Sequence, residues 1–247
     1  MMPQLFGDSA APLYGVLHPS ARSGTTRVAA VVCAPLGHEY LQAHRVLRKL
    51  ADEVASRGIP SLRFDYMGTG DSSGDADAVT LTQLRSDTSH AIDEVRGLTR
   101  ARKVVLIALR GGAFPALLNL DGASVIGCVL WDPVIDGTIV VNSLSAEAMA
   151  ASTDTRSLGG FEYSKRFQDD LASFDPSAHW PVSPCDVRIV AHSDADFAEL
   201  RSRKPQLMWI QTTNSLDFGT PGSQDLLHVA EGELMQVVDV VESIAIG

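Results

Sequence analysis

The stretch Lys103–Leu109, followed by Arg110-Gly111-Gly112, could place a side chain where chemistry happens. An apolar, β-branched run that ends in a glycine-rich turn predicts a strand leading directly into a helix. At such a turn many enzymes carry a nucleophilic serine in the pattern Gly-x-Ser-x-Gly, beside amides that bind an anionic oxygen. This chain has an arginine there instead. Because a guanidinium has no lone pair to donate, covalent acyl-enzyme chemistry at residue 110 is excluded.

Three interpretations of Arg110 follow from its chemistry. Its guanidinium could pair with a carboxylate such as Asp132 or Asp196, which would make it structural. A planar fork beside a helix N-terminus could instead bind an anionic group of a ligand. Finally, the side chain could support noncovalent acid–base or electrostatic chemistry. Because a buried arginine without a partner is very unfavourable, we expect a carboxylate or an anionic ligand beside Arg110 if the turn is buried.

Three other residues invite a catalytic interpretation. Ser72 lies in Gly70-Asp71-Ser72-Ser73-Gly74, which matches the serine pattern letter for letter. No buried strand directly precedes it, so we interpret this stretch as a structural loop. Cys33 lies inside an apolar run and is expected to be an inert packing residue. His38 could move a proton near neutral pH, although a histidine that only caps or packs fits the sequence as well.

The elements that would position these residues alternate along the chain. The first 20 residues predict an antiparallel hairpin. Strands are then expected at Val28–Ala34, Ile59–Asp65, Lys103–Leu109, Val125–Trp131, Val187–Ala191 and Leu207–Thr212. Helices are expected at His44–Arg57, Thr80–Leu98 and Gly232–Ile246, with another around Phe114 and Leu117. This order predicts an α/β class with a mainly parallel central sheet and helices on both faces.

Length and composition restrict the class of protein further. The 247 residues are expected to form a single domain, in which 137–184 is either a cap or a surface excursion. A net charge of -10 without a dense Lys/Arg patch disfavours nucleic-acid binding. No apolar run is long enough for a membrane helix, and we expect no signal peptide. Three scattered cysteines favour a reducing, cytoplasmic location. No metal-ligand spacing or phosphate loop is present, so we expect neither metal nor cofactor.

The order of the motifs resembles a known family. Strand, "APLGHEY", helix, strand, "FDYMGTGDSSG", helix, strand, "ALRGG", helix, strand and "WDPVIDG" follow one another as in the α/β-hydrolase superfamily. The chain is most similar to exosortase-associated, serine aminopeptidase-like hydrolases, over most of residues 12–190. The resemblance implies an α/β-hydrolase fold in which the amides of Leu36, Gly37 and Gly111 could hold an anionic oxygen. Tyr40 and His44 would then line the same region.

The resemblance also implies an acid and a late histidine. Hydrolases of this kind present an aspartate just after the strand at Val187–Ala191, where Asp196 fits best and Asp194 lies close. His228 is the sole histidine after His192, although its neighbours would equally suit a surface helix. Asp132, at the carboxyl end of a strand, lies at the rim where α/β sheets bind ligands.

Three functions remain open from the sequence. The first is a protein without a serine nucleophile that binds an acyl or carboxylate-bearing small molecule, in a biosynthetic pathway, with possible noncovalent chemistry by Arg110 and His38 or His228. The second is a pseudoenzyme, a binding or scaffold subunit whose pocket is closed by an Arg110–Asp pair. The third is an esterase or thioesterase with an unrecognised nucleophile. A homodimer is compatible with each.

Overall fold

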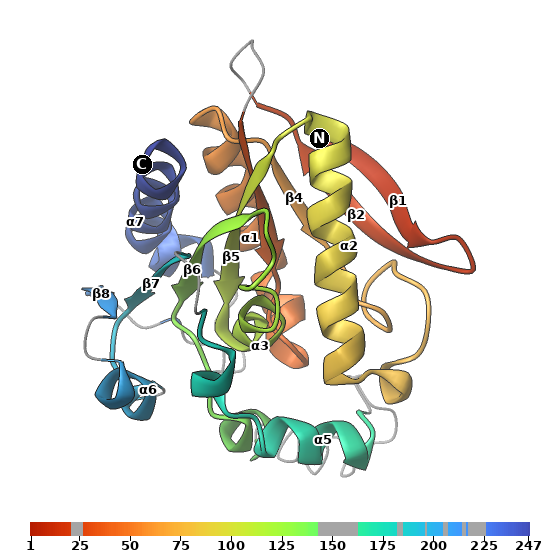
Figure 1. The fold of residues 1–247 in the computed structure, drawn as a ribbon, viewed down its shortest axis with the longest axis vertical. Helices are drawn as coiled ribbons and strands as arrows, with labels where there is room; N and C mark the ends of the chain where they lie inside the picture. Colours follow the sequence, from red (N-terminus) through yellow and green to blue (C-terminus); the bar gives the residue numbers. More distant parts are fainter. Residues whose placement is uncertain are drawn as a thin grey trace.

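An eight-stranded sheet in the order β1-β2-β4-β3-β5-β6-β7-β8 forms the centre of the computed structural model (Figure 1). The structure describes residues 1–20, 27–142, 163–181, 185–195, 197–204, 207–213, 216 and 226–247, with backbone alone for 226–230. The strands are β1 (Met2–Asp8), β2 (Ala11–His18), β3 (Val28–Cys33), β4 (Ser61–Phe64), β5 (Lys103–Leu109), β6 (Val125–Trp131), β7 (Asp186–Ala191) and β8 (Met208–Gln211). β2 is antiparallel to both β1 and β4, and all other neighbours are parallel, which confirms the predicted hairpin and parallel sheet.

Helices cover both faces of this sheet. They are α1 (His38–Ser56), α2 (Leu81–Thr99), α3 (Ala113–Leu117), α5 (Lys165–Ala172), α6 (Ala198–Arg203) and α7 (Leu226–Ile246), with 3-10 turns η1 (Ala76–Ala78), η2 (Arg110–Gly112) and η3 (Pro176–His179). α1 and α7 pack together on one face, and α2 and α3 lie on the other (Figure 1). Arg57, directly after α1, joins α1 to α7 through ion pairs to Asp239, at 3.0 Å, and to Glu242. The α/β class predicted from the sequence is therefore confirmed.

Three predicted boundaries were wrong for local reasons. α1 begins at His38, six residues before the predicted start, because Gly37 at φ 64° turns the chain directly into the helix. α7 already begins at Leu226, so Gly232 is inside the helix. A Cβ at Gly232 would meet no atom within 4 Å, which shows that this position faces open space and tolerates glycine. β4 begins only at Ser61, since Pro60 has no N–H for the sheet.

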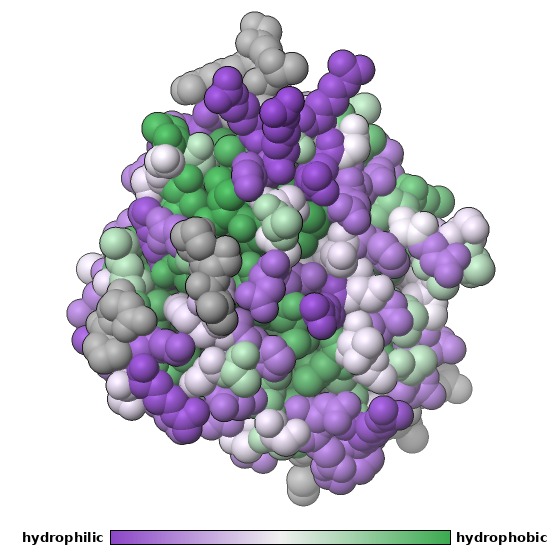
Figure 2. All heavy atoms as spheres, in the orientation of Figure 1, coloured by the Kyte–Doolittle hydropathy of each residue, from purple (hydrophilic) through white to green (hydrophobic). Residues whose placement is uncertain are grey.

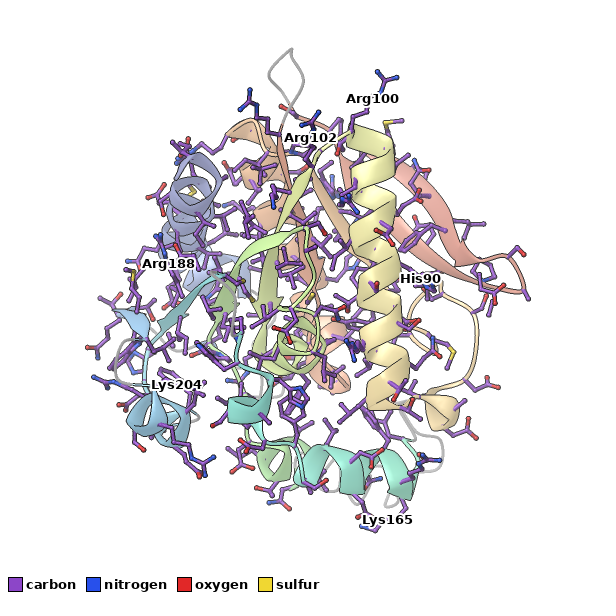
Figure 3. The ribbon with its side chains drawn as sticks, viewed as in Figure 1. His90, Arg100, Arg102, Lys165, Arg188 and Lys204 are labelled. Atoms are coloured by element: carbon purple, nitrogen blue, oxygen red, sulfur yellow. The ribbon has the colours of Figure 1, made fainter. Side chains whose placement is uncertain are left out.

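The parallel strands β3, β5, β6 and β7 all end at one edge of the sheet, the lower edge in Figure 1. α5 and α6 lie near this edge, and Lys165 of α5 marks it in Figure 3, opposite Arg100 and Arg102. Residues 137–142 are helical, whereas 143–162 and 182–184 lie outside the described residues. The predicted cap over 137–184 therefore stays a prediction.

The surface is mixed in character. Figure 2 shows mainly hydrophilic side chains on one face, with hydrophobic surface gathered between α7 and the centre of the view. Among the described residues, none of the helices combines the length and the apolar character needed to span a bilayer. The predicted homodimer is not tested by this structure of one chain.

Candidate functional site

The turn between β5 and α3 holds Arg110 in a left-handed conformation, with φ 51°. This conformation is unfavourable for any residue with a Cβ and is typical of the tight strand-to-helix turns that display a side chain. Two residues on, Gly112 lies so close to β3 that a Cβ would come 2.4 Å from the Cys33 carbonyl oxygen and 2.6 Å from that of Ala34. The glycine therefore lets the turn pack directly against the end of β3.

Arg110 is paired with two carboxylates. Its Nε donates to Glu39 Oε1 at 3.2 Å, and its Nη2 lies 3.2 Å from the same oxygen. Its Nη1 donates to the Asp132 carbonyl oxygen at 3.3 Å and lies 3.6 Å from Asp132 Oδ2. The predicted contact with Asp132 is thus present, and Glu39 is a partner that the sequence analysis missed. Asp196, the other suggested partner, lies outside the described residues.

This Arg110–Glu39–Asp132 cluster is mostly shielded from solvent. The three side chains are 17%, 22% and 13% exposed in that order. Asp132 also has a left-handed backbone, with φ 44°, and its amide donates to the Val190 carbonyl oxygen at 2.7 Å. Two strained residues from neighbouring parallel strands therefore face each other at the carboxyl edge. Strained backbone of this kind concentrates at functional sites.

The loop after β3 contributes the predicted amides. A Cβ added to Gly111 would lie 3.6 Å from the Leu36 amide nitrogen, so these two segments are adjacent as expected. The Gly37 amide donates instead to the Tyr163 hydroxyl oxygen, at 3.3 Å in a buried position. Tyr163 is 126 positions away along the chain, and nothing local in the sequence indicates the contact. One of the three candidate anion-binding amides is therefore already occupied by the protein.

Tyr40 and Ser72 form hydrogen bonds that hold the loop after β4 in place. The Tyr40 hydroxyl donates to Asp65 Oδ1 at 2.7 Å, and the Asp71 amide donates to Asp65 Oδ2 at 3.1 Å. Ser72 Oγ donates to the Asp65 carbonyl oxygen at 2.6 Å and accepts from the Tyr14 amide at 2.8 Å. Burial, and then the Asp65 charge, raise the pKa of Tyr40 well above its usual range. These contacts support the structural interpretation of the Gly70–Gly74 loop.

The remaining candidates lie apart from Arg110 or outside the described residues. His38 opens α1, where its Nε2 lies 2.9 Å from Gln42 Nε2. His44, on the same helix, lines a gap of only about 10 Å³ with Tyr40 and Asp65. Within the described part of the chain, no hydrogen bond or ion pair joins either histidine to Arg110. The side chain of His228 is not among the described residues.

Two further observations limit the chemistry. Burial raises the pKa of the Cys33 thiol to about 12, so this thiol stays protonated at neutral pH, as expected for a packing residue. In the described ranges, no group of three or more His, Cys, Asp and Glu side chains is arranged to hold a metal ion. A larger cavity, of about 380 Å³, lies between η3 and α6 at the same edge, and Arg110 does not line it.

Comparison with known proteins addresses the fold. No family model matches the chain, and no curated protein matches its sequence. Among solved structures, Est1E from Butyrivibrio proteoclasticus aligns over 100% of both chains with a TM-score of 0.68 and 10% identity. A lidless α/β serine hydrolase from Xanthomonas campestris aligns over 98% of this chain and 92% of its own, with a TM-score of 0.64 and 15% identity. The chain has the α/β-hydrolase fold.

Other neighbours show that this fold also occurs outside the esterases. AqDC, described as recognising and cleaving the ring of the Pseudomonas quinolone signal, aligns over 99% of this chain and 100% of its own, with a TM-score of 0.61 and 13% identity. All these identities are too low to transfer an activity. In the α/β-hydrolase fold a nucleophile is displayed on a turn between a strand and a helix, and β5, η2 and α3 form a turn of that kind in this chain. The side chain at this turn is therefore the first one to interpret.

Proposed function

We propose that this chain is a non-hydrolytic binding protein built on the α/β-hydrolase fold, in which Arg110 stands where serine hydrolases carry the nucleophile. The observation that carries this proposal is the Arg110–Glu39–Asp132 cluster at the strained turn. A guanidinium cannot attack a carbonyl carbon, because it has no lone pair to donate. An acyl-enzyme cannot form on this residue, whatever substrate enters.

The charges of the cluster favour a structural role for Arg110 over recognition of an anion. Among the described residues, the guanidinium of Arg110 already faces two carboxylates, those of Glu39 and Asp132. A carboxylate-bearing ligand would have to displace Glu39 or Asp132 from Arg110 and would lose the attraction that the displaced ion pair supplies. The Gly37 amide is also engaged, by Tyr163. These contacts support the pseudoenzyme hypothesis above the anion-binding one.

Noncovalent catalysis has less support from the described residues. General acid–base chemistry needs a titratable group within reach of the reacting atoms. His38 contacts Gln42 on its own helix, and its described contacts do not include the cluster. The ring cleavage described for AqDC indicates that the fold can host chemistry of another kind, so turnover is a defined alternative for the experiment below.

The experiment is active-site labelling with a fluorophosphonate probe, combined with hydrolysis assays on p-nitrophenyl esters of short and long acyl chains. We expect no labelled serine and no hydrolysis above the buffer rate. A Ser72→Ala variant serves as the matched control, because Ser72 has the one literal serine-motif match. Stoichiometric labelling of the wild-type protein, mapped by mass spectrometry to any serine, would contradict the proposal. Loss of that label in Ser72→Ala would then identify the nucleophile.

A further inference from the structure

The cavity of about 380 Å³ at the carboxyl edge of the sheet is large enough for a small ligand. It lies between the segment that contains α5 and η3 and the segment that follows β7, and Arg110 is not part of its lining. It is lined by Ile135, Asp136, Ala172, Phe174, Asp175, Pro176, Ser177, Ala195, Phe197, Ala198, Glu199, Leu200 and Arg203. Pockets of this size that join an apolar wall to a few polar groups are the usual form of a small-molecule site.

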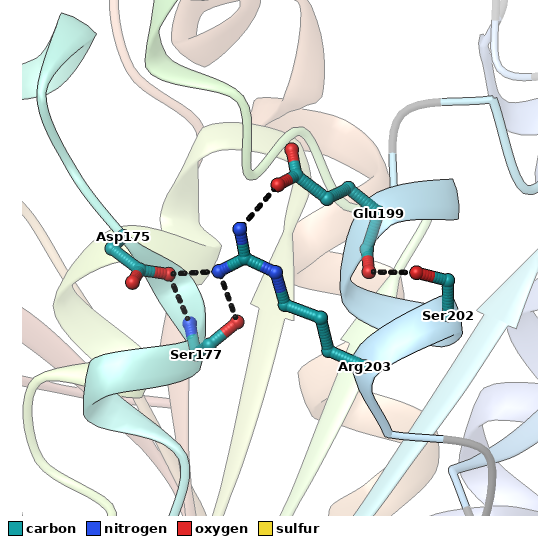
Figure 4. Close-up of polar contacts among 5 residues, drawn as sticks. All are labelled: Asp175, Ser177, Glu199, Ser202 and Arg203. Carbon is teal, nitrogen blue, oxygen red and sulfur yellow. Dashed lines mark hydrogen bonds and ion pairs between the residues drawn. The ribbon is translucent and has the colours of Figure 1, made fainter.

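Acidic side chains outnumber basic ones in this lining. Among the described lining residues, Asp136, Asp175 and Glu199 contribute three carboxylates, and Arg203 contributes one guanidinium. Figure 4 shows that guanidinium between η3 and α6, where Nη1 lies 3.4 Å from Asp175 Oδ1 and Nη2 lies 2.5 Å from Glu199 Oε1. Nη1 also donates to Ser177 Oγ at 3.3 Å. Arg203, although 49% exposed, therefore already has two carboxylate partners, with which an anionic ligand would have to compete.

Asp136 is different from the other two acids. Its Oδ1 accepts from the Thr138 amide at 2.8 Å and from the Thr138 hydroxyl at 2.6 Å. Within the described ranges, no Lys, Arg or His side chain forms an ion pair with it. Asp136, which is exposed, thus places at the cavity a carboxylate that no cation in the described part of the chain neutralises.

The rest of the wall suits an apolar body with a positive charge. Phe174 is half-buried and reaches the cavity, whereas Phe197, Leu200 and Ile135 lie behind the wall with 2%, 1% and 3% of their surface exposed. Phe174 lies edge to face against Phe114, with ring centroids 5.1 Å apart, and one of its faces stacks on His179 at 4.9 Å, so its other face is the one left for a ligand. Aromatic rings attract cations through their π electrons, and carboxylates add a direct ionic attraction. An ammonium group with a hydrocarbon substituent satisfies both features of this wall.

We propose that this cavity binds a small organic cation, an amine protonated at neutral pH and attached to an apolar, ring-sized carbon skeleton. Its ammonium group pairs with Asp136, and its skeleton lies against Phe174. The proposal supplies a ligand class for the binding role proposed above and rests on that role for its biological meaning. The cavity does not include Arg110, however, so cation binding and the absence of hydrolysis are tested separately.

The test uses three probes that share one ring and differ in charge: benzylammonium, benzyl alcohol and benzoate. Binding is followed in the full chain by calorimetry and by the Trp209 indole resonance, because Trp209 packs edge to face on Phe197 with centroids 5.7 Å apart. We expect benzylammonium to bind best and benzoate worst. Added salt should weaken benzylammonium binding, since the ionic attraction is screened.

A pair of variants identifies the carboxylate. Asp136→Asn keeps an oxygen to accept from Thr138 and removes the charge, so the local turn is preserved. Asp77→Asn, on the exposed turn η1, removes the same charge elsewhere. We expect Asp136→Asn to weaken benzylammonium binding about two- to fivefold, the range for an exposed ionic contact, and Asp77→Asn to leave it unchanged.

Three results would overturn the proposal. The first is tighter binding of benzoate than of benzylammonium, which would make Arg203 the receptor. The second is an equal response of the two variants. The third is no saturable benzylammonium binding by the folded protein at tens of millimolar. In any of these cases a negative labelling result with the fluorophosphonate probe would still stand, so the failure would belong to the ligand class and not to the non-hydrolytic role.

Discussion

Replacing Arg110 separately by alanine and by glycine distinguishes the contribution of its ion pairs to stability from the cost of its left-handed backbone. Both variants lose the ion pairs to Glu39 and Asp132, and glycine alone is free of the left-handed penalty at φ 51°. Removing one partner of a fully buried pair costs about 3–5 kcal/mol. Because the three side chains are 13% to 22% exposed, we expect a loss of about 1–3 kcal/mol for Arg110→Ala.

The glycine variant should be the more stable of the two. A left-handed backbone costs about 1–2 kcal/mol for a residue with a Cβ, a cost that glycine avoids. Glycine, however, loses more conformational entropy on folding than alanine, which reduces its advantage by about 0.5–1 kcal/mol. At the midpoints of these two ranges the difference is about 0.75 kcal/mol in favour of glycine, or roughly 1.5–3 °C in Tm for a chain of this size. Urea unfolding and thermal melts, each read by circular dichroism, measure both quantities.

Ala113→Gly is the matched control, because residue 113 has an ordinary helical backbone with φ -61°. At that position glycine should be less stable than alanine, by about 1 kcal/mol. If Arg110→Ala proved at least as stable as Arg110→Gly, the left-handed strain inferred at the turn would be wrong. If Arg110→Ala matched the wild type, the ion pairs would contribute nothing to the fold.

Three more predictions concern neighbouring features. Gly112→Ala should unfold the protein or lower its Tm sharply in a thermal melt, because the added Cβ would lie 2.4 Å from a β3 carbonyl oxygen; a melt like that of the wild type would contradict the packing described. Ser72→Ala should lower the free energy of unfolding in urea by about 1–3 kcal/mol through its two lost hydrogen bonds, and an unchanged value would show that Ser72 is not structural. Burial lowers the pKa of His18, whose Nε2 accepts from Arg63 at 3.1 Å and whose Nδ1 lies 2.7 Å from Asp52 Oδ1. Because the unfolded chain then binds a proton more readily, the stability from neutral His18 is complete above about pH 6.5 and falls as the pH drops through the folded-state pKa. Urea midpoints between pH 7.5 and 5 should show this fall, and a His18→Leu variant should show a shallower one.

The local pattern of apolar residues was sufficient to predict where most strands of the sheet lie. The apolar runs that became β3, β5 and β6 are bounded by proline, glycine or charged residues, so each strand could be placed from its own residues. The starts of α1 and α7 could not, because helical periodicity alone did not reveal their first turns. The interior glycine of α7 misled the prediction, since glycine ends many helices and is also tolerated on an exposed helix face.

Ser72 matches the Gly-x-Ser-x-Gly pattern, but the backbone around it does not have the structure that the pattern requires. Its neighbours Gly70 and Gly74 both have positive φ, which makes the segment a turn-rich loop and not a strand-to-helix elbow. The structure adds what holds this loop in place, since the Asp71 amide donates to Asp65 Oδ2. By contrast, Tyr40 was expected to line a ligand region, and its described hydrogen bond goes to Asp65.

Sequence by itself determined what residue 110 cannot do, because the chemistry of a guanidinium excludes a covalent acyl intermediate in any fold. It also determined that the side chain lies on a turn between a strand and a helix. Only the tertiary structure decided its partners. Glu39, Arg110 and Asp132 come from three segments that meet because parallel strands end at one edge of the sheet, and which carboxylate reaches the guanidinium depends on packing across segments distant in the chain.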